Sequence, residues 1–200
     1  MKNCLLCGVG GQGTVLASRI LAAAAMEKGL FVRTAETIGM AQRGGSVVSH
    51  VRIEPQSPSP LIPPGTADAL LGFEPGEAVR NLHYLKPGGV AVVSCQPVEP
   101  VAAAVGGVRY SGEEMLAYLK AHVERLYILD AAAIGAACGS DKVMNVALAG
   151  ALAATGAIGL GPGYLLRALE KQLKPQYLEI NRRALELGAR AVEENTHEND

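Results

Sequence analysis

Two short glycine-rich segments contain the residues of this chain whose types and spacing suit ligand chemistry. The first has the sequence GVGGQG at residues 8–13, between an apolar run and a helical pattern. Its glycines allow a tight turn and let backbone N–H groups approach a phosphate, while the helix N-terminus adds free N–H donors and a partial positive charge. The spacing G-x-G-x-x-G in this context predicts an anion-binding turn. Its candidate residues are Gly8, Gly10, Gly11, Gln12 and Gly13.

The second segment has the sequence QRGG and follows a loop that carries Met40. Its arginine supplies a fixed planar charge, which suits a phosphate or a carboxylate. We expect the two segments to face an anion together, and the alternative for the arginine is a solvent-exposed loop charge. The candidate residues of this segment are Gln42, Arg43, Gly44 and Gly45.

Glu36 lies near the end of the second expected strand, where a dinucleotide-binding enzyme places the carboxylate that binds the ribose. Taken alone, it favours a stand-alone NAD(P)- or nucleotide-binding protein. Two features count against that alternative: the segment after Glu36 does not begin a helix at once, and nothing after the sheet resembles a separate catalytic domain. A third possibility is that the glycines only let a strand and a helix pack closely. The residues by themselves leave these alternatives open.

Apolar, β-branched runs alternate with helical patterns along the chain. The alternation predicts an α/β fold, with a Rossmann-like, mostly parallel sheet flanked by helices and a C-terminal helical segment. We expect one domain over residues 1–200, with a frayed tail from about residue 190. The expected strands cover residues 2–9, 30–36, 46–53, 68–73, 88–95 and 125–131, and the expected helices cover 14–29, 74–85, 111–123 and the segment after Ser140.

Three local features refine this prediction. Residues 55–65 contain five prolines, which remove backbone donors and fix φ, so they should form a surface loop. Residues 46–53 place His50 and Arg52 on one polar side, which predicts a strand at a sheet edge or beneath a partner. A stripe of small residues would let another backbone come close, either within the domain, as is ordinary, or from a partner. The stripe consists of Ala147, Gly150, Ala151 and Ala154.

Composition excludes several classes of function. The net charge is −1 with mixed signs, so we expect no nucleic-acid partner and no anionic membrane partner. The N-terminus is too short and polar for a signal peptide, and no uninterrupted apolar run approaches a membrane span, which predicts a cytoplasmic protein with reduced thiols. Cys4 and Cys7 should point to opposite faces of a strand and cannot hold one cluster. The histidines lack metal-ligand spacing, so we expect neither a metal site nor a catalytic residue in this chain.

The motifs GVGGQGT and AETIGMAQRGGSVVSHVRI, together with NVALAGALAATG near residue 145, resemble the gamma-type subunit or domain of the 2-oxoacid:ferredoxin oxidoreductases, the pyruvate/ketoisovalerate oxidoreductase family. The resemblance extends from residue 3 to about residue 190 and is greatest to the indolepyruvate branch. The two glycine-rich motifs at this separation are far more specific together than either is alone.

The resemblance implies an accessory subunit of a complex that oxidatively decarboxylates a 2-oxoacid, joins the acyl group to coenzyme A and passes electrons to ferredoxin. It implies a larger partner subunit that holds thiamine diphosphate, magnesium and iron–sulfur clusters, because this chain lacks their signatures. An aryl pyruvate would be the substrate on the indolepyruvate branch, with pyruvate, 2-ketoisovalerate and 2-oxoglutarate as alternatives. The bound anion would be a coenzyme A phosphate, a cofactor diphosphate held by the partner or a partner carboxylate. Without its partner, the chain is expected to self-associate or to keep its partner-facing segments mobile.

Overall fold

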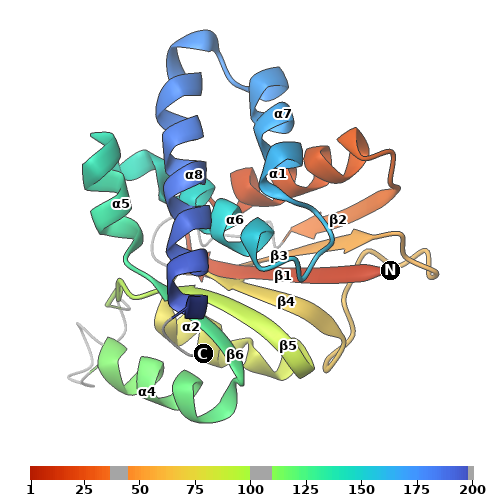
Figure 1. Ribbon diagram of the computed structural model, residues 1–200. Helices are drawn as coiled ribbons and strands as arrows, with labels where there is room; N and C mark the ends of the chain where they lie inside the picture. The colour runs from red at the N-terminus through yellow and green to blue at the C-terminus, as the bar shows by residue number, and fades with distance from the viewer. Residues whose placement is uncertain (37–44, 100–109, 198–200) are drawn as a thin grey trace.

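The structure is a computed structural model that describes residues 1–36, 45–99 and 110–197. A six-stranded sheet in the order β2-β3-β1-β4-β5-β6 runs through the middle of the molecule (Figure 1). The strands are β1 (Lys2–Val9), β2 (Val32–Glu36), β3 (Ser46–Ile53), β4 (Ala67–Gly72), β5 (Leu85–Ser94) and β6 (Arg125–Leu129). All six expected strands are therefore confirmed, with small shifts at their ends.

Five of these strands share one direction and β3 runs opposite to them. The pairs β1·β4, β4·β5 and β5·β6 are parallel, while β3 is antiparallel to both of its neighbours, β1 and β2. The mostly parallel α/β fold is thus confirmed, and the sheet is mixed because of β3.

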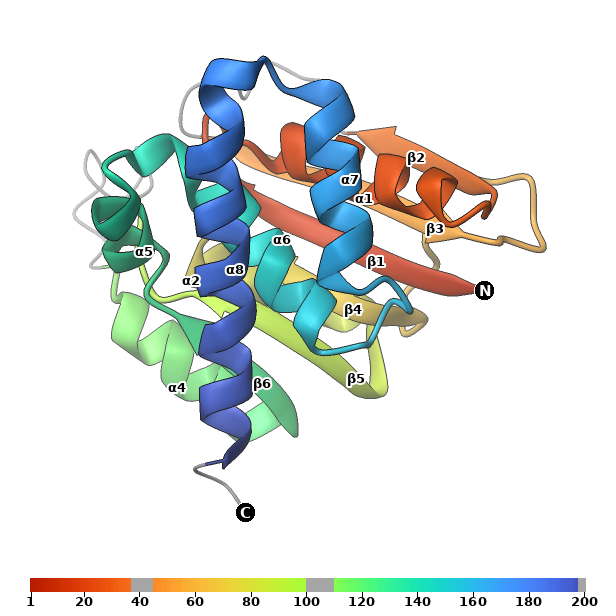
Figure 2. The same ribbon diagram turned by 45° about the horizontal axis from the view of Figure 1, so that its top comes forward.

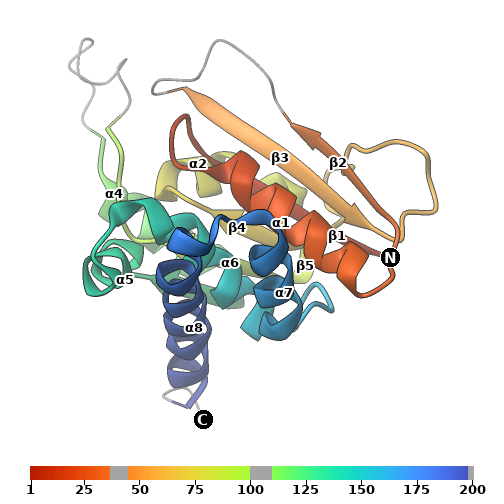
Figure 3. The ribbon, with the colours of Figure 1, turned by 90° about the horizontal axis from the view of Figure 1, so that it is seen from above.

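Helices cover both faces of the sheet. One layer contains α1, α5, α6, α7 and α8, and α2 and α4 pack on the other face (Figures 1 and 3). The bounds are α1 (Thr14–Glu27), α2 (Pro75–Arg80), α4 (Gly112–His122), α5 (Ala131–Cys138), α6 (Met144–Ala154), α7 (Pro162–Gln172) and α8 (Pro175–His197), with short 3₁₀ helices η1 (Leu82–Tyr84) and η2 (Asp141–Val143).

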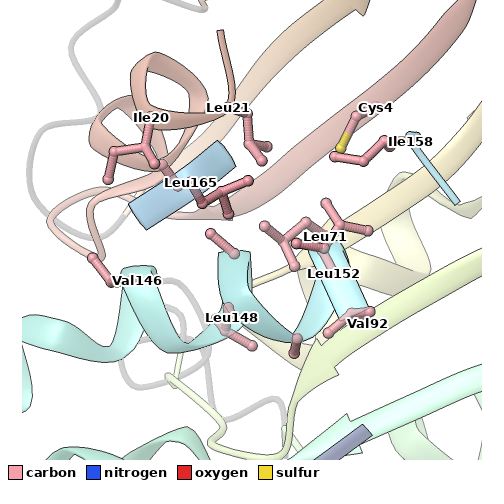
Figure 4. Packing of buried hydrophobic residues seen from close by; sticks show 14 of the residues in the cluster. Cys4, Ile20, Leu21, Leu71, Val92, Val146, Leu148, Leu152, Ile158 and Leu165 are labelled. Atoms are coloured by element: carbon pink, nitrogen blue, oxygen red, sulfur yellow. The ribbon is translucent and has the colours of Figure 1, made fainter. Parts of the chain in front are cut away.

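The larger core lies between the sheet and the helix layer that contains α6. Figure 4 shows Leu71 and Val92 of the sheet against Leu148 and Leu152 of α6. Cys4 belongs to this core, whereas Cys7 belongs to the smaller core on the opposite face, so the two thiols do point to opposite faces of β1. Because β1 is buried on both faces, its side chains are apolar nearly throughout.

Several helix ends follow from local sequence. Pro75 occupies the first turn of α2, where its missing N–H costs nothing, and the Glu74 carboxylate accepts the Glu77 N–H at 2.8 Å. Ser111 caps α4, since its Oγ accepts the Glu114 N–H at 3.3 Å.

Two element predictions were wrong in detail. Helix α5 was not expected, although Asp130 caps it and Gly139 ends it in a left-handed conformation. Strand β5 begins at Leu85 instead of residue 88, so Leu85, expected as the last residue of a helix, belongs to the strand. Helix α8 continues to His197, past residue 190, near which the frayed tail was expected to begin.

The prediction that residues 46–53 lie at a sheet edge is also wrong, because β3 lies between β2 and β1. Its polar side is covered by the proline-rich loop of the same chain. Arg52 Nη1 donates to the carbonyls of Ser59 at 2.6 Å and Leu61 at 3.1 Å, and His50 Nδ1 accepts the Ile62 N–H at 3.2 Å. The proline-rich segment contains neither helix nor strand, as expected.

The stripe of small residues on α6 packs against α8 of the same chain. A Cβ on Gly150 would lie 2.3 Å from the Leu185 carbonyl oxygen, and a Cβ on Gly188 would lie 1.9 Å from the Ala147 carbonyl oxygen. The two backbones therefore touch. Packing within the chain explains the stripe, and no partner is needed to cover it.

Candidate functional site

The glycine-rich turn lies at the carboxyl edge of the parallel strands. Strands β1 and β4 are neighbours, but α1 follows β1 on one face of the sheet while α2 follows β4 on the other. Connections that leave neighbouring strands in opposite directions open a crevice where open α/β sheets bind their ligands. The turn at residues 8–13 lies in this crevice, as the motif predicts.

The turn is held in one conformation by its own polar groups. Gly11 and Gly13 have backbone φ values of 102° and 83°, which residues other than glycine rarely adopt. Gln12 Oε1 accepts the Val9 N–H at 2.7 Å, and Gln12 Nε2 donates to the Phe73 carbonyl at 3.1 Å. Gln12 therefore fixes the turn, and its side chain also lines the hollow beside it.

Only part of the turn can donate to an anion. The Gly10 N–H donates to the Gly45 carbonyl at 2.9 Å, which joins the turn to the start of β3, and the Gln12 N–H donates to the Val9 carbonyl at 3.1 Å. Within the described residues, the amides of Gly11 and Gly13 have no such acceptor. Gly8 serves packing, since a Cβ there would lie 2.7 Å from the Phe73 Cβ.

A hollow of about 460 Å³ opens beside the turn. The N-terminal turns of three helices, α1, α5 and α6, converge on it. Helix α1 has no side-chain cap, so its first N–H groups and the positive end of its dipole face the hollow. The lining residues are Gly11, Gln12, Gly13, Ala131, Ala132, Asp141, Lys142, Met144 and Asn145.

Two side chains of the hollow add donors. Asn145 is 4% exposed, and its Nδ2 would lie 2.7 Å from a Cβ on Gly13, so it contacts the turn directly. Its Oδ1 accepts the Val146 N–H at 2.9 Å, which leaves Nδ2 directed away from the backbone of α6. The exposed Lys142 supplies an ammonium group, partly balanced by Asp141. The arrangement favours an anion because donors and helix dipoles predominate.

Two buried carboxylates lie beyond the turn, at the start of α2. Glu77 accepts from Ser46 Oγ at 2.5 Å and from Arg80 Nε at 3.2 Å. Glu74 accepts from the Tyr110 hydroxyl, and burial together with this carboxylate raises the pKa of Tyr110. These contacts connect β3, α2 and residue 110 around the crevice, so they stabilise the position of these segments relative to one another.

The second candidate segment is only partly within the described residues. Gly45 accepts from the turn, as stated above, whereas Gln42, Arg43 and Gly44 lie outside the residues that the structure describes. Glu36 is not placed for a ribose: β3 occupies the position beside β1, and Glu36 Oε1 accepts from Ser18 Oγ of α1 at 3.0 Å. The arrangement does not favour the NAD(P)-binding alternative.

The metal-ligating side chains of the described residues do not cluster. The described residues contain no group of three or more His, Cys, Asp and Glu side chains able to hold a metal ion. Burial raises the pKa values of Cys4 and Cys7, which keeps both as neutral thiols. Across the described ranges, no helix is long and apolar enough to span a membrane.

The sequence motifs did not predict the side of the hollow that the starts of α5 and α6 form. Asp130 before an alanine run with Gly139 behind it signals a helix start and stop, and this signal would have placed α5. Asn145 lies in the segment NVALAG, which contributed to the family resemblance but not to the site prediction. The missed lining residues are Ala131, Ala132, Asp141, Lys142, Met144 and Asn145.

The crevice and the strand order define a Rossmann-like subunit with a reversed third strand. Over residues 3–191 the sequence matches the family described as pyruvate ferredoxin/flavodoxin oxidoreductase, and the chain belongs to this family. It is 35% identical over 197 residues to the indolepyruvate oxidoreductase subunit IorB of Thermococcus kodakarensis, covering 96% of each chain.

Solved structures share the fold. The gamma subunit of a keto/oxoacid ferredoxin oxidoreductase from Geobacter sulfurreducens superposes with a TM-score of 0.70 at 23% identity, covering 97% of this chain and 99% of that one. The 2-oxoglutarate:ferredoxin oxidoreductase from Magnetococcus marinus, solved with 2-oxoglutarate, coenzyme A and succinyl-CoA bound, gives 0.68 at 20% identity, covering 96% of this chain and 31% of that one. The chain is thus a subunit of an oxidoreductase complex, and the expected family is confirmed.

Proposed function

We propose that the chain is the accessory subunit of a thiamine diphosphate-dependent indolepyruvate:ferredoxin oxidoreductase. The complex would decarboxylate an aryl pyruvate oxidatively, form its acyl-CoA and pass the electrons to ferredoxin. The choice of substrate is supported by the subunit name of the relative that is 35% identical. A larger partner would hold thiamine diphosphate, magnesium and the iron–sulfur clusters.

The residues of this chain do not fit those groups. Its closely spaced thiols, Cys4 and Cys7, are buried in separate cores on opposite faces of β1, so they cannot ligate one cluster. The sequence also lacks the Gly-Asp-Gly signature that accompanies thiamine diphosphate. We therefore assign the electron-transfer chemistry to the partner.

The contribution of this chain would be to bind a phosphate of coenzyme A in the hollow beside the glycine-rich turn. The observation that supports this role is the uncapped N-terminus of α1, which faces the hollow together with the amides of Gly11 and Gly13. Lys142 would add an ammonium group, and Asn145 Nδ2 a neutral donor. Such donors bind a phosphate in one orientation and leave the thiol end of coenzyme A free to reach the partner.

The test is purification of the complex from anaerobic lysate through a tag on this chain. The eluate is assayed for indolepyruvate-dependent reduction of an artificial electron acceptor, with and without coenzyme A. We expect a large partner subunit with iron–sulfur absorbance and coenzyme A-dependent activity on the aryl pyruvate. A chain that elutes alone and binds NAD(H) at micromolar concentration would contradict the proposal.

A variant separates the coenzyme A role from the subunit role. Lys142→Gln should raise the KM for coenzyme A by about tenfold, because it removes one charge-assisted contact to the phosphate. The KM for indolepyruvate should stay unchanged. Lys120→Gln, an exposed charge on α4, is the matched control. An unchanged KM for coenzyme A would reject the hollow as its site while leaving the subunit assignment intact.

A further inference from the structure

A row of charged side chains lies at the amino edge of the sheet, opposite the glycine-rich turn. Lys2 begins β1 and Arg125 begins β6, while Asp68 and Lys86 are the second residues of β4 and β5. The four strands are adjacent and parallel in the order β1-β4-β5-β6 (Figure 1), so their first residues lie at the same edge of the sheet. From β1 to β6 the signs are positive, negative, positive and positive.

These side chains line a hollow of about 220 Å³, here named the amino-edge pocket. The segment after α6 forms another wall of the pocket, and in Figure 2 it lies in front of the sheet. The complete lining is Lys2, Asp68, Lys86, Gly88, Val90, Arg125, Thr155, Gly156 and Ala157.

A β-bulge shapes the pocket. The register between β4 and β5 pairs Ala67 with Leu85 but Ala69 with Val90, so the four residues 86–89 stand opposite Asp68 alone. Gly88 makes this possible with a φ of 67°. Lys86 belongs to these four residues, and its ammonium group lies 2.6 Å from Asp68 Oδ1.

The charges of the pocket do not cancel. Asp68 Oδ1 lies 2.6 Å from Lys86 Nζ and 3.7 Å from Lys2 Nζ, while its Oδ2 accepts the Asn3 N–H at 2.8 Å. The Asp68 side chain is 12% exposed and both lysine side chains are 43% exposed, so the carboxylate orients two ammonium groups that remain accessible. Within the described residues Arg125 forms no ion pair, so the lining has three cations and one anion, a net charge of +2.

The geometry points to the amino-edge pocket as a binding site for a small oxyanion with two negative charges, such as a phosphate group or a short dicarboxylate. Arg125 supplies a planar fork of donors for two oxygens, and the lysines supply point charges. The pocket is smaller than the roughly 300–1,000 Å³ that drug-sized ligands occupy, which favours a ligand of a few heavy atoms. Because the pocket lies at the other edge of the sheet, its role is independent of the proposed function.

The test is titration of the isotope-labelled full-length chain with inorganic phosphate and, separately, with succinate, followed residue by residue by NMR. We expect saturable shifts of the Gly88, Gly156 and Ala157 amides at millimolar anion. These signals separate the pocket from the glycine-rich turn, which Gly11 and Gly13 report. Binding of phosphate alone, of succinate alone or of both supports the site and identifies which oxyanion it takes.

Variants decide whether the charges of the pocket are responsible. Arg125→Gln, which breaks no ion pair among the described residues, should weaken the affinity at the pocket amides at least tenfold, and Arg125→Lys should weaken it less. Lys120→Gln, an exposed cation on α4, should change nothing. The inference is overturned if neither anion shifts the three pocket amides, if only Gly11 and Gly13 respond, or if Arg125→Gln binds as tightly as the unaltered chain.

Discussion

Gly13 carries two constraints where Gly11 carries one. Both have positive φ, but a Cβ on Gly13 would meet Asn145 Nδ2 at 2.7 Å, whereas a Cβ on Gly11 would have open space around it. Gly11→Ala should therefore destabilise the chain by about 1 kcal/mol through backbone strain, and Gly13→Ala by about 1–3 kcal/mol more through the clash. Urea unfolding of the two variants measures the difference. Equal losses would show that Asn145 moves aside.

The protonation state of His50 should make the packing of the proline-rich loop, and with it the stability of the fold, depend on pH. Burial, reinforced by the charge of Arg52, lowers the pKa of His50, and its neutral Nδ1 accepts the Ile62 N–H. The ordinary pKa in the unfolded chain is about 6.5, so as the pH falls through and below that value the unfolded state binds more protons and the folded state loses stability. The stability that neutral His50 contributes is therefore fully present above about pH 6.5 and declines as the pH falls toward the lowered pKa of His50 in the folded chain.

The measurement is urea unfolding at pH 7.5 and 5.5. The unaltered chain should lose more stability between these two conditions than His50→Gln, which keeps an acceptor but does not titrate. The protection factor of the Ile62 amide, which corrects for the slower intrinsic exchange at low pH, should fall on acidification in the unaltered chain. An equal pH dependence in both proteins would show that His50 does not contribute.

The contact between α6 and α8 depends on the absence of two side chains. Gly188→Ala would place a Cβ 1.9 Å from the Ala147 carbonyl oxygen, so the helices must separate, at a cost of about 1–3 kcal/mol. Gly163→Ala is the matched control, because on α7 a Cβ would have only Arg167 Nη1 at 4.0 Å, and alanine should stabilise that helix by about 0.5–1 kcal/mol. Thermal unfolding should shift in opposite directions for the two variants. A Gly188→Ala variant as stable as the unaltered chain would contradict the close contact.

Element types were predictable to the extent that local pattern determines them. Apolar runs predicted all six strands, and the helices expected over 74–85 and 111–123 are present as α2 and α4 with shorter bounds. The direction of β3 was not predictable, because alternation along a strand does not depend on which way its neighbours run. The sheet-edge prediction for residues 46–53 failed for a related reason. Arg52 and His50 are buried by a loop that follows them in sequence, and the pattern of one strand cannot show what covers that strand.

The candidate site was predictable only on its glycine side. The motif placed the turn, because turn glycines and a helix start are close in sequence. Lys142 and Asn145 reach the same hollow from more than a hundred residues away, and only the return of α6 to the α1 face brings them there. Gln12 was expected to face a ligand; it lines the hollow, and its amide also hydrogen-bonds the backbone of Val9 and Phe73, which the motif could not show.

For the whole molecule, thiol reactivity should report global opening. Cys4 and Cys7 are buried in β1 with raised pKa values, whereas Cys95 and Cys138 are partly exposed. With a thiol reagent at neutral pH, we expect Cys138 to react first, Cys95 more slowly because burial raises its pKa as well, and Cys4 and Cys7 only as the chain unfolds. Mass spectrometry of quenched samples assigns each site. Fast labelling of Cys4 or Cys7 in the native chain would contradict the burial of β1.

The isolated chain has less need of a partner than its small-residue stripe suggested, because α8 already covers α6. Self-association of the isolated chain stays a prediction, and it must now rest on surfaces other than that stripe. Sedimentation of the purified chain over a range of concentrations measures it.

The central position of β1 has a consequence for biosynthesis. This strand leaves the ribosome before its two neighbours, β3 and β4, which end only at Ile53 and Gly72. Until both have been made, the apolar segment KNCLLCGV lacks at least one of its strand partners and its covering layers are incomplete. The nascent chain therefore exposes an aggregation-prone segment until the end of β4 has been made, and a chaperone would protect it most during that interval.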